Sequence, residues 1–347
     1  MSAPGCLTSE LFRREGAVPA TVIAVAHSGI PFITAYVWSA SGFGTKFSDP
    51  GTIPTGNAND VAITSNANAI AVAHDNTPFV TAYPFSASGF GSKFANPGVL
   101  QPGTGKRVAF TEARNAIAVI GGDVPWTQVY SWSVSGFGSK FANPATVPVS
   151  TGNAVAFTAT GDAIAAAHNG TLRIFVYPWS ASGFGTKFSD PGTLPTGNGK
   201  GVDFTNAGDA IAVAHDTTPF ISIYPWSGSG FGSKFANPGT LPSETPFNIA
   251  FSATNDAVAI VGNVTPFITA YPWSSSGFGT KFANPATLPS SSARGVAFTA
   301  TGDAIAVAHT TTPIVTAYPW SASGFGTKFS DPGTLPDSTA GNGVAFA

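Results

Sequence analysis

The sequence predicts an all-β fold: a seven-bladed β-propeller of four-stranded antiparallel blades, closed by one C-terminal strand plus three N-terminal strands. Three observations predict it, namely a 47-residue unit that occurs seven times, several short β-type runs in each unit, and complementary chain ends. Residues 1–20 fall outside the repeat. We therefore expect an N-terminal tail over residues 1–20 and a single propeller over residues 21–347.

A Gly-Phe-Gly triplet marks the repeat most clearly. Every tyrosine of the protein lies in one column of the repeat, and six of the seven tryptophans lie two residues later. Residues 177–195 and 318–336 are identical, which indicates recent duplication. The phenylalanine of the triplet recurs every 47 residues, at Phe43, Phe90, Phe137, Phe184, Phe231, Phe278 and Phe325.

Residues 201–242 illustrate the four strands that we expect in each unit. The first three are expected at residues 202–205, 210–215 and 220–226, and the outer strand near residues 234–236. The second and third strands are nearly continuous apolar runs, as expected when both faces of a blade pack against neighbours. Because one blade cannot bury both faces alone, only a closed ring is stable.

The two chain ends predict how the ring closes. The first unit begins at its second strand, residues 22–27, with no Val-Ala-Phe strand before it. The sequence ends just after Val344, Ala345 and Phe346. The C-terminal segment therefore supplies the missing first strand, so that no sheet edge is left exposed.

In period, strand order and closure, residues 21–347 resemble the WD40 superfamily. The third strand ends in Trp-Ser, as at Trp38-Ser39 and Trp226-Ser227, where that family has Trp-Asp, and no Gly-His precedes the first strand. The resemblance is therefore to WD40-like propellers of a recently amplified repeat type. It implies the propeller fold and a non-catalytic role as an interaction platform.

Composition restricts the partners and the location. Charged residues are 9% of the chain and the net charge is −2, so we expect no nucleic-acid partner. Cys6 is the single cysteine, which excludes an intrachain disulfide. Charged residues interrupt residues 10–15 before any apolar run, so we expect no signal peptide and no membrane insertion. A cytoplasmic protein, or a component of a particle assembled in the cytoplasm, fits these features.

Sequence variation among the units is concentrated in two sets of loops. The loops that join one unit to the next differ in nearly every unit, and the turns between second and third strands vary as well. Both sets emerge on one side of a propeller, here called the loop face, where a rigid scaffold usually carries ligand-binding residues. Drift in exposed loops is the alternative. We place a protein or glycan ligand on this face, with candidate binding residues His74, Lys106, Arg107, His168, Lys200, His215, Glu244, Arg294 and His309.

All five histidines occupy one column at the end of the second strand, where the other two units have Gly121 and Gly262. Equivalent positions in different blades should lie about 10 Å or more apart, since strands are spaced by about 4.7 Å. Zinc ligands lie at about 2.1 Å, so a shared metal site is not expected. We expect these histidines to end the strand by hydrogen bonding to the neighbouring loop; repeated sugar or side-chain pockets are the alternative.

Two further features bear on chemistry. The aromatic column of Trp38 and Trp226 favours packing over a sugar-stacking platform, because it lies beside the constant turn. Asp203 replaces alanine in a first strand and is a singleton in the expected central channel. No catalytic triad or carboxylate pair is recognisable. We therefore predict no catalytic residues, no metal and no cofactor.

These features favour a non-enzymatic binding or structural propeller. Its similar blades would engage a repetitive partner, such as a glycan or an assembled, phage-like particle, through several weak sites at once. The alternative is a propeller hydrolase or lactonase with its site at the mouth of the central channel near Asp203.

Overall fold

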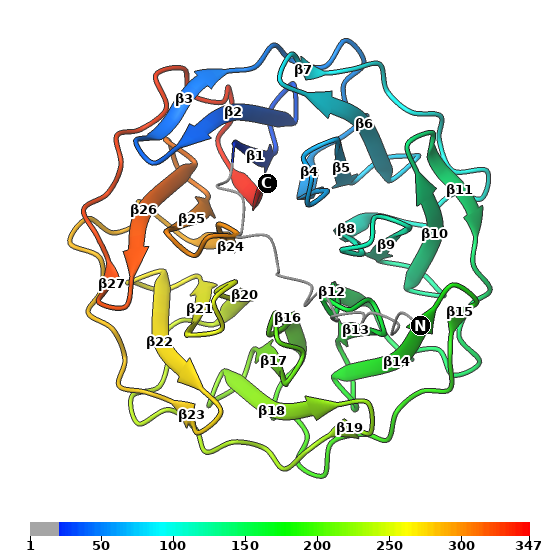
Figure 1. Ribbon diagram of the computed structural model, residues 1–347, viewed down its shortest axis with the longest axis vertical. Coiled ribbons are helices and arrows are strands. Elements are labelled where there is room, and N and C mark those ends of the chain that lie inside the picture. Colours follow the sequence, from blue (N-terminus) through cyan, green and yellow to red (C-terminus); the bar gives the residue numbers. More distant parts are fainter. Residues whose placement is uncertain (1–20) are drawn as a thin grey trace, which may run out of the picture.

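A computed structural model of the protein describes residues 21–347, which form seven four-stranded antiparallel sheets arranged as the blades of a ring (Figure 1). This confirms the predicted fold class. The expected N-terminal tail, residues 1–20 with Cys6, lies outside the described residues. Within residues 21–347 there is no helix long and apolar enough to cross a membrane.

Each blade runs from an innermost first strand to a short outer strand. The first strands are β28 (Gly341–Phe346), β4 (Ala58–Ile63), β8 (Gly105–Phe110), β12 (Gly152–Phe157), β16 (Gly199–Phe204), β20 (Pro246–Phe251) and β24 (Ala293–Phe298). The second strands are β1 (Val22–His27), β5 (Ala69–His74), β9 (Ala116–Gly121), β13 (Ala163–His168), β17 (Ala210–His215), β21 (Ala257–Gly262) and β25 (Ala304–His309). The third strands are β2 (Ile33–Ser39), β6 (Val80–Ser86), β10 (Thr127–Ser133), β14 (Ile174–Ser180), β18 (Ile221–Ser227), β22 (Ile268–Ser274) and β26 (Val315–Ser321). The outer strands are β3 (Gly42–Lys46), β7 (Gly89–Phe90), β11 (Gly136–Lys140), β15 (Gly183–Phe184), β19 (Gly230–Phe231), β23 (Gly277–Phe278) and β27 (Gly324–Phe325).

The outer strand is the one element whose expected position is wrong. It was expected near residues 234–236, but β19 begins at Gly230 and covers two residues. Pro225 on the neighbouring β18 has no N–H to donate, so pairing ends early. In the two blades that have Val37 or Ser131 in place of this proline, β3 and β11 continue as far as the lysine.

The ring closes as the chain ends predict. β28 pairs antiparallel with β1, with Ala345 opposite Ala24 and Val344 opposite Val25, so one blade has the order β28-β1-β2-β3. The backbone N–H of Thr21 also donates to the carbonyl of Ala347, at 2.7 Å. The two ends of the described chain are therefore held side by side in the same blade (Figure 1).

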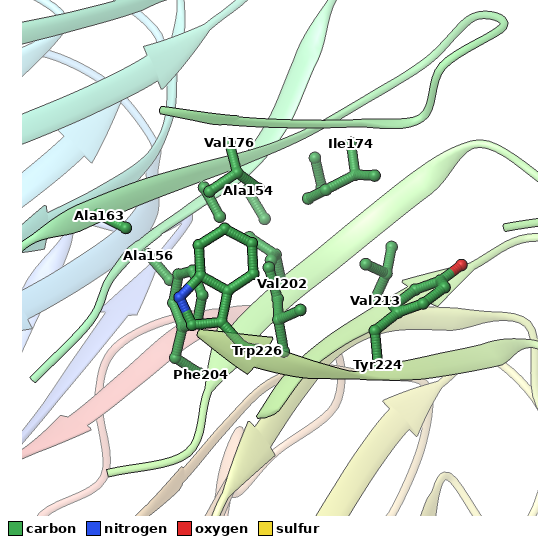
Figure 2. Packing of buried hydrophobic residues seen from close by; sticks show 13 residues of the cluster. Ala154, Ala156, Ala163, Ile174, Val176, Val202, Phe204, Val213, Tyr224 and Trp226 are labelled. Atoms are coloured by element: carbon green, nitrogen blue, oxygen red, sulfur yellow. The ribbon is translucent and has the colours of Figure 1, made fainter. Parts of the chain in front are cut away.

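The core lies between the blades. Every second strand is buried along its whole length, and each hydrophobic cluster joins side chains of two neighbouring blades. Figure 2 shows one such cluster, in which Ala154 and Val176 of one blade face Val202 and Trp226 of the next. The ring of Trp226 also meets Phe188 of the preceding blade edge-on, with centroids 5.0 Å apart. The aromatic column is 5 to 7% exposed in all seven blades, so it serves packing, as the sequence favours.

The same packing explains the constant Gly-Phe-Gly turn. The first glycine of each triplet has φ between +90° and +103°, a conformation that strongly favours glycine. A Cβ there would also lie 2.8 to 3.4 Å from a phenylalanine of the preceding blade, such as Phe329 against Gly42. The turn is therefore fixed both by its own backbone and by the neighbouring blade.

Removal of β28 tests the closure. Deletion of residues 341–347 is expected to abolish cooperative thermal unfolding, because β1 loses its partner strand and the inner faces of two blades are exposed. The free energy of unfolding should fall by more than roughly 5 kcal/mol, which is the lower end of typical domain stabilities. Circular dichroism during heating measures it. The control is a circular permutant that begins at residue 341 and joins residues 347 and 21 by a short linker, which should unfold as the parent does. A deletion variant with the parental melting temperature would contradict this closure.

Candidate functional site

Every first strand contains a β-bulge near its beginning. In β16, Gly199 pairs with His215 and Gly201 with Ala214, so Lys200 has no partner in the ladder. The same shift occurs in all seven blades. A bulge displaces one residue from the pairing and redirects its side chain. The displaced residues, here called the bulge ring, are Asn59, Lys106, Asn153, Lys200, Phe247, Arg294 and Asn342.

The bulge ring surrounds one cavity at the mouth of the central channel. All first strands surround the axis and run in the same direction, so their bulges lie at the same end (Figure 1). The cavity has a volume of about 410 Å³, and all seven members of the ring line it. Asp75, Thr104 and Arg107 complete the wall. The fold thereby brings together the members of the bulge ring, which are 47 or more positions apart in the sequence.

Hydrogen bonds fix the asparagines of the ring. The Asn59 side-chain amide donates to Asp75 Oδ1 at 2.7 Å and to the carbonyl of Gly105, on the next blade, at 2.9 Å. Asn153 makes the equivalent pair of bonds, to Asn169 Oδ1 and to the Gly199 carbonyl. The polar wall is therefore held in place before any ligand arrives, which favours binding.

Arg107 spans the channel beside the bulge ring. Its guanidinium donates to the carbonyl of Asn59 on the adjacent β4 at 3.0 Å and to that of Arg294 on β24 at 3.2 Å. β24 and β8 are separated in the ring by β28 and β4. The guanidinium therefore crosses the axis and contributes to the floor of the cavity.

Positive charge dominates the cavity. Lys106, Arg107, Lys200 and Arg294 line it, and Asp75 is the one carboxylate among its lining residues. Burial lowers the pKa of Lys106, and the nearby Lys200 and Arg107 lower it further. Partial burial and Arg107 likewise lower the pKa of Arg294. These cations are thus held close enough to repel one another, and an anion in the cavity would relieve that repulsion.

The structure divides the nine candidate binding residues into two groups. Four of them, Lys106, Arg107, Lys200 and Arg294, meet at the cavity. The other five, His74, His168, His215, His309 and Glu244, are fully buried within or between blades and do not reach the surface of the loop face.

The histidines hold strands together. In four blades Nε2 contacts a hydroxyl of the third strand, as His27 does with Thr34 at 2.9 Å. The expected contact with a loop is seen in three blades: Nδ1 of His168 lies 3.1 Å from the carbonyl of Ser150, Nδ1 of His309 lies 3.2 Å from Ser290 Oγ, and Nδ1 of His215 lies 3.5 Å from Thr196 Oγ1. Burial lowers the pKa of all five to about 4. Among residues 21–347, no group of three His, Cys, Asp or Glu side chains is placed to hold a metal ion.

Glu244 takes the place of a histidine. Its blade has Gly262 at the histidine position, where an added Cβ would lie 2.7 Å from the Cβ of Glu244. Thr269 donates to Glu244 Oε2 at 3.2 Å, so the glutamate contacts the same hydroxyl column that the histidines contact. In the other blade without a histidine, Gln101 fills the corresponding space at Gly121. Glu244 is therefore a structural substitute for the missing ring.

Asp203 lies at the opposite end of the channel. It lines a second cavity of about 220 Å³ formed by the far ends of the first strands, with Phe157, Phe204, Phe251 and Phe298. Its two oxygens accept hydrogen bonds from the backbone N–H groups of Phe204 and Phe251, at 2.9 and 2.8 Å. Burial raises the pKa of Asp203 to about 7. The carboxyl group thus links two blades at the end of the channel that lies away from the bulge ring.

Asp75 and the four uncharged members of the bulge ring are not among the residues that the sequence predicts for a site. The available signal was a single column that changes between asparagine, lysine, phenylalanine and arginine while the valine two residues later is nearly constant. Alternation alone does not show that this column faces the channel, because the bulge breaks the alternation.

Comparisons with known proteins find the fold in many solved structures. No protein-family model matches the chain, and no curated protein sequence matches it. A candidate 6-phosphogluconolactonase from Bacteroides fragilis aligns with a TM-score of 0.74 and 11% identity, over 95% of this chain and 98% of its own. The periplasmic gluconolactonase PpgL of Pseudomonas aeruginosa aligns with a TM-score of 0.68 and 13% identity, over 94% and 99%. The β-propeller domain of Swd1 from Myceliophteria thermophila aligns with a TM-score of 0.57 and 11% identity, over 80% and 86%. These likenesses agree with the WD40-like propeller that the sequence predicts.

The comparisons overturn the main functional prediction. The expectation of a non-enzymatic binding or structural propeller is wrong, because two of the similar structures are named as a gluconolactonase and a candidate 6-phosphogluconolactonase. The sequence shows no recognisable triad or carboxylate pair, whereas the ring assembles its polar cavity from seven units. The protein or glycan partner and the cytoplasmic or particle location stay predictions.

The buried histidines predict a pH-dependent stability. Their pKa is lowered from 6.5 to about 4, so the stability that the neutral rings contribute is present above pH 6.5 and is lost as the pH falls toward 4. We expect the free energy of unfolding to decrease over this range, by up to about 1.4 kcal/mol per pH unit for each histidine. Urea unfolding at several pH values measures it. The variant H215Q should reduce the change of the free energy of unfolding with pH by the contribution of about one proton. An unchanged pH dependence would contradict the assignment.

Glu244 predicts the opposite pH dependence. Burial raises its pKa, and its Oε1 has no hydrogen-bond partner among the described residues. The stability associated with the protonated carboxyl is therefore present below its unfolded pKa and is lost as the pH rises. The variant E244Q should be more stable than the parent at pH 8, by on the order of 1 kcal/mol, and show a smaller advantage at pH 5. Melting temperatures at both pH values test this, and an equal advantage at both would contradict it.

Proposed function

We propose that the protein is a hydrolase of the lactonase type whose active site is the cavity inside the bulge ring. The observation that carries the proposal is the convergence of four cationic side chains and one carboxylate on this cavity at the channel mouth. The likeness of the fold to a gluconolactonase and to a candidate 6-phosphogluconolactonase supports it. The volume of about 410 Å³ is within the range typical of small-molecule sites.

Asp75 is the general base of the proposed reaction. It directly follows β5, its backbone N–H donates to the carbonyl of Asn57, and the amide of Asn59 orients its carboxylate. A carboxylate fixed in this way can accept the proton of a water molecule as that water adds to the ester carbonyl carbon. Asp216, a nearby carboxylate, is occupied by an ion pair with Lys200 at 3.2 Å.

The cations complete the chemistry. Addition of water to a lactone gives a tetrahedral oxyanion, which positively charged donors in a partly enclosed cavity stabilise. The ring C–O bond then breaks, the departing alkoxide recovers the proton from Asp75, and the product is a hydroxy acid. Phe247 supplies an apolar wall to the site. This sequence of steps requires only water and the lactone.

Hydrolysis of glucono-δ-lactone and of 6-phosphogluconolactone by the purified chain tests the proposal. We expect acceleration over the spontaneous rate for at least one lactone, and a loss of about 10²- to 10⁴-fold in kcat for D75N, since the general base is removed. The matched control is D203N, which removes a carboxylate at the other end of the channel and should keep the activity. No acceleration by the parent protein would refute the function, and loss of activity in D203N with retention in D75N would refute the assigned site.

A further inference from the structure

We infer that the cavity inside the bulge ring contains an anion-binding subsite, formed by Lys106, Arg294 and Arg107, that takes the phosphate of a phosphorylated lactone. The lactone part of this inference rests on the proposed function, whereas phosphate binding by the cavity does not. Three observations carry it: uncompensated charge, donors held in fixed positions, and a confined volume.

The charge on Lys106 and Arg294 is not compensated by a carboxylate. Among residues 21–347, Lys200 is the one cation of the cavity that forms a salt bridge, with Asp216. Lys106 Nζ instead donates to Asn153 Oδ1 at 3.2 Å, and Arg294 donates to Asn342 Oδ1 at 2.7 Å. Amide oxygens are neutral, so both positive charges remain for a ligand. Phosphate monoesters carry close to two negative charges at neutral pH and accept several hydrogen bonds from lysine and arginine.

The local sequence explains why these two cations have no carboxylate partner among residues 21–347. In four blades the bulge residue contacts the first residue of the turn after the second strand of its own blade: Asn59 contacts Asp75, Asn153 contacts Asn169, Lys200 contacts Asp216 and Asn342 contacts Ser28. The equivalent turn residue for Lys106 is Gly122, which has no side chain. For Arg294 it is the uncharged Thr310. Each cation therefore reaches toward the next blade and stays available to a ligand at the channel mouth.

The donors are preorganised. The acceptor of Arg294, Asn342, is 5% exposed and donates in turn to the carbonyl of Ala58 at 2.8 Å. The acceptor of Lys106, Asn153, donates to the carbonyl of Gly199 at 2.7 Å. Arg107 is fixed by two backbone carbonyls on opposite sides of the channel, and its buried Nε has no hydrogen-bond partner within residues 21–347. Little ordering of side chains is then needed when an anion binds, which favours affinity.

Arg107 also has a carboxylate nearby. Asp60 is buried beside it, and burial raises the pKa of Asp60 while Arg107 opposes that rise. Asp60 Oδ2 accepts a hydrogen bond from the backbone N–H of Val108 at 3.1 Å. Arg107 is therefore the partly neutralised member of the subsite, and Lys106 and Arg294 are the residues on which anion affinity should depend most.

Isothermal titration calorimetry of the full chain with inorganic phosphate and with 6-phosphogluconate tests the subsite directly. We expect both ligands to bind the parent protein, more weakly as NaCl is raised, and the affinity to fall at least tenfold in K106M and in R294Q. The variant K106R keeps the charge and should keep most of the affinity. The matched control is K93M, which removes a lysine from the outer rim of the ring, where Lys93 contacts Asn96. Melting curves verify that each variant is folded.

The outcomes separate this inference from the proposed function. Absence of phosphate binding, or equal affinity in the parent, K106M and R294Q, would overturn the subsite even if a neutral lactone is hydrolysed. Phosphate binding that depends on Lys106 and Arg294 would support the subsite even if neither lactone is hydrolysed, and the proposed function would then fail alone. If both lactones are hydrolysed, K106M should raise KM for the phosphorylated lactone at least tenfold more than it raises KM for the neutral one. An equal effect on both would assign Lys106 to general electrostatics and overturn the inference.

Discussion

The mutual burial of blade faces is the constraint on which the structure depends. A blade of this repeat is apolar on both sides of its second strand, and tryptophan, phenylalanine and the glycine of the tight turn meet across each blade boundary. No blade is stable alone, so the ring must close, and β28 closes it on β1. Because every boundary repeats the same contacts, substitution in the packed columns would disturb two blades at once.

The bulge in each first strand allows the residue that lines the cavity to vary while the blade faces stay buried. A residue excluded from the ladder lines the cavity and does not belong to the apolar clusters between blades, so it can differ from blade to blade. Closure then places all seven such residues around one axis. In this way a nearly symmetric scaffold acquires an asymmetric cavity with lysine, arginine, asparagine and phenylalanine on its wall. Valine two residues later, as at Val61 and Val202, faces the core and hardly changes.

The functional correction follows from the same geometry. A triad or a carboxylate pair within one unit is the usual sign of catalysis in a sequence, and this sequence has none. The polar groups of the cavity instead come from strands and turns of different blades. Asp75, the adjacent pair Lys106 and Arg107, Lys200 and Arg294 come together only in three dimensions. The buried histidines, in contrast, form a column that five of the seven units share, and they serve as neutral hydrogen-bonding partners within their blades.

The sequence by itself determined the number of blades, the strand order, the closure and the packing role of the aromatic column, because a fixed period and unbroken apolar runs allow few other arrangements. It also identified Lys106, Arg107, Lys200 and Arg294 as candidates. Only the tertiary structure decided that these four meet while the histidines and Glu244 are buried. The reason is physical: a one-residue bulge reverses the side to which the following residues point, and neither the bulge nor the convergence of strands on an axis is encoded in local periodicity.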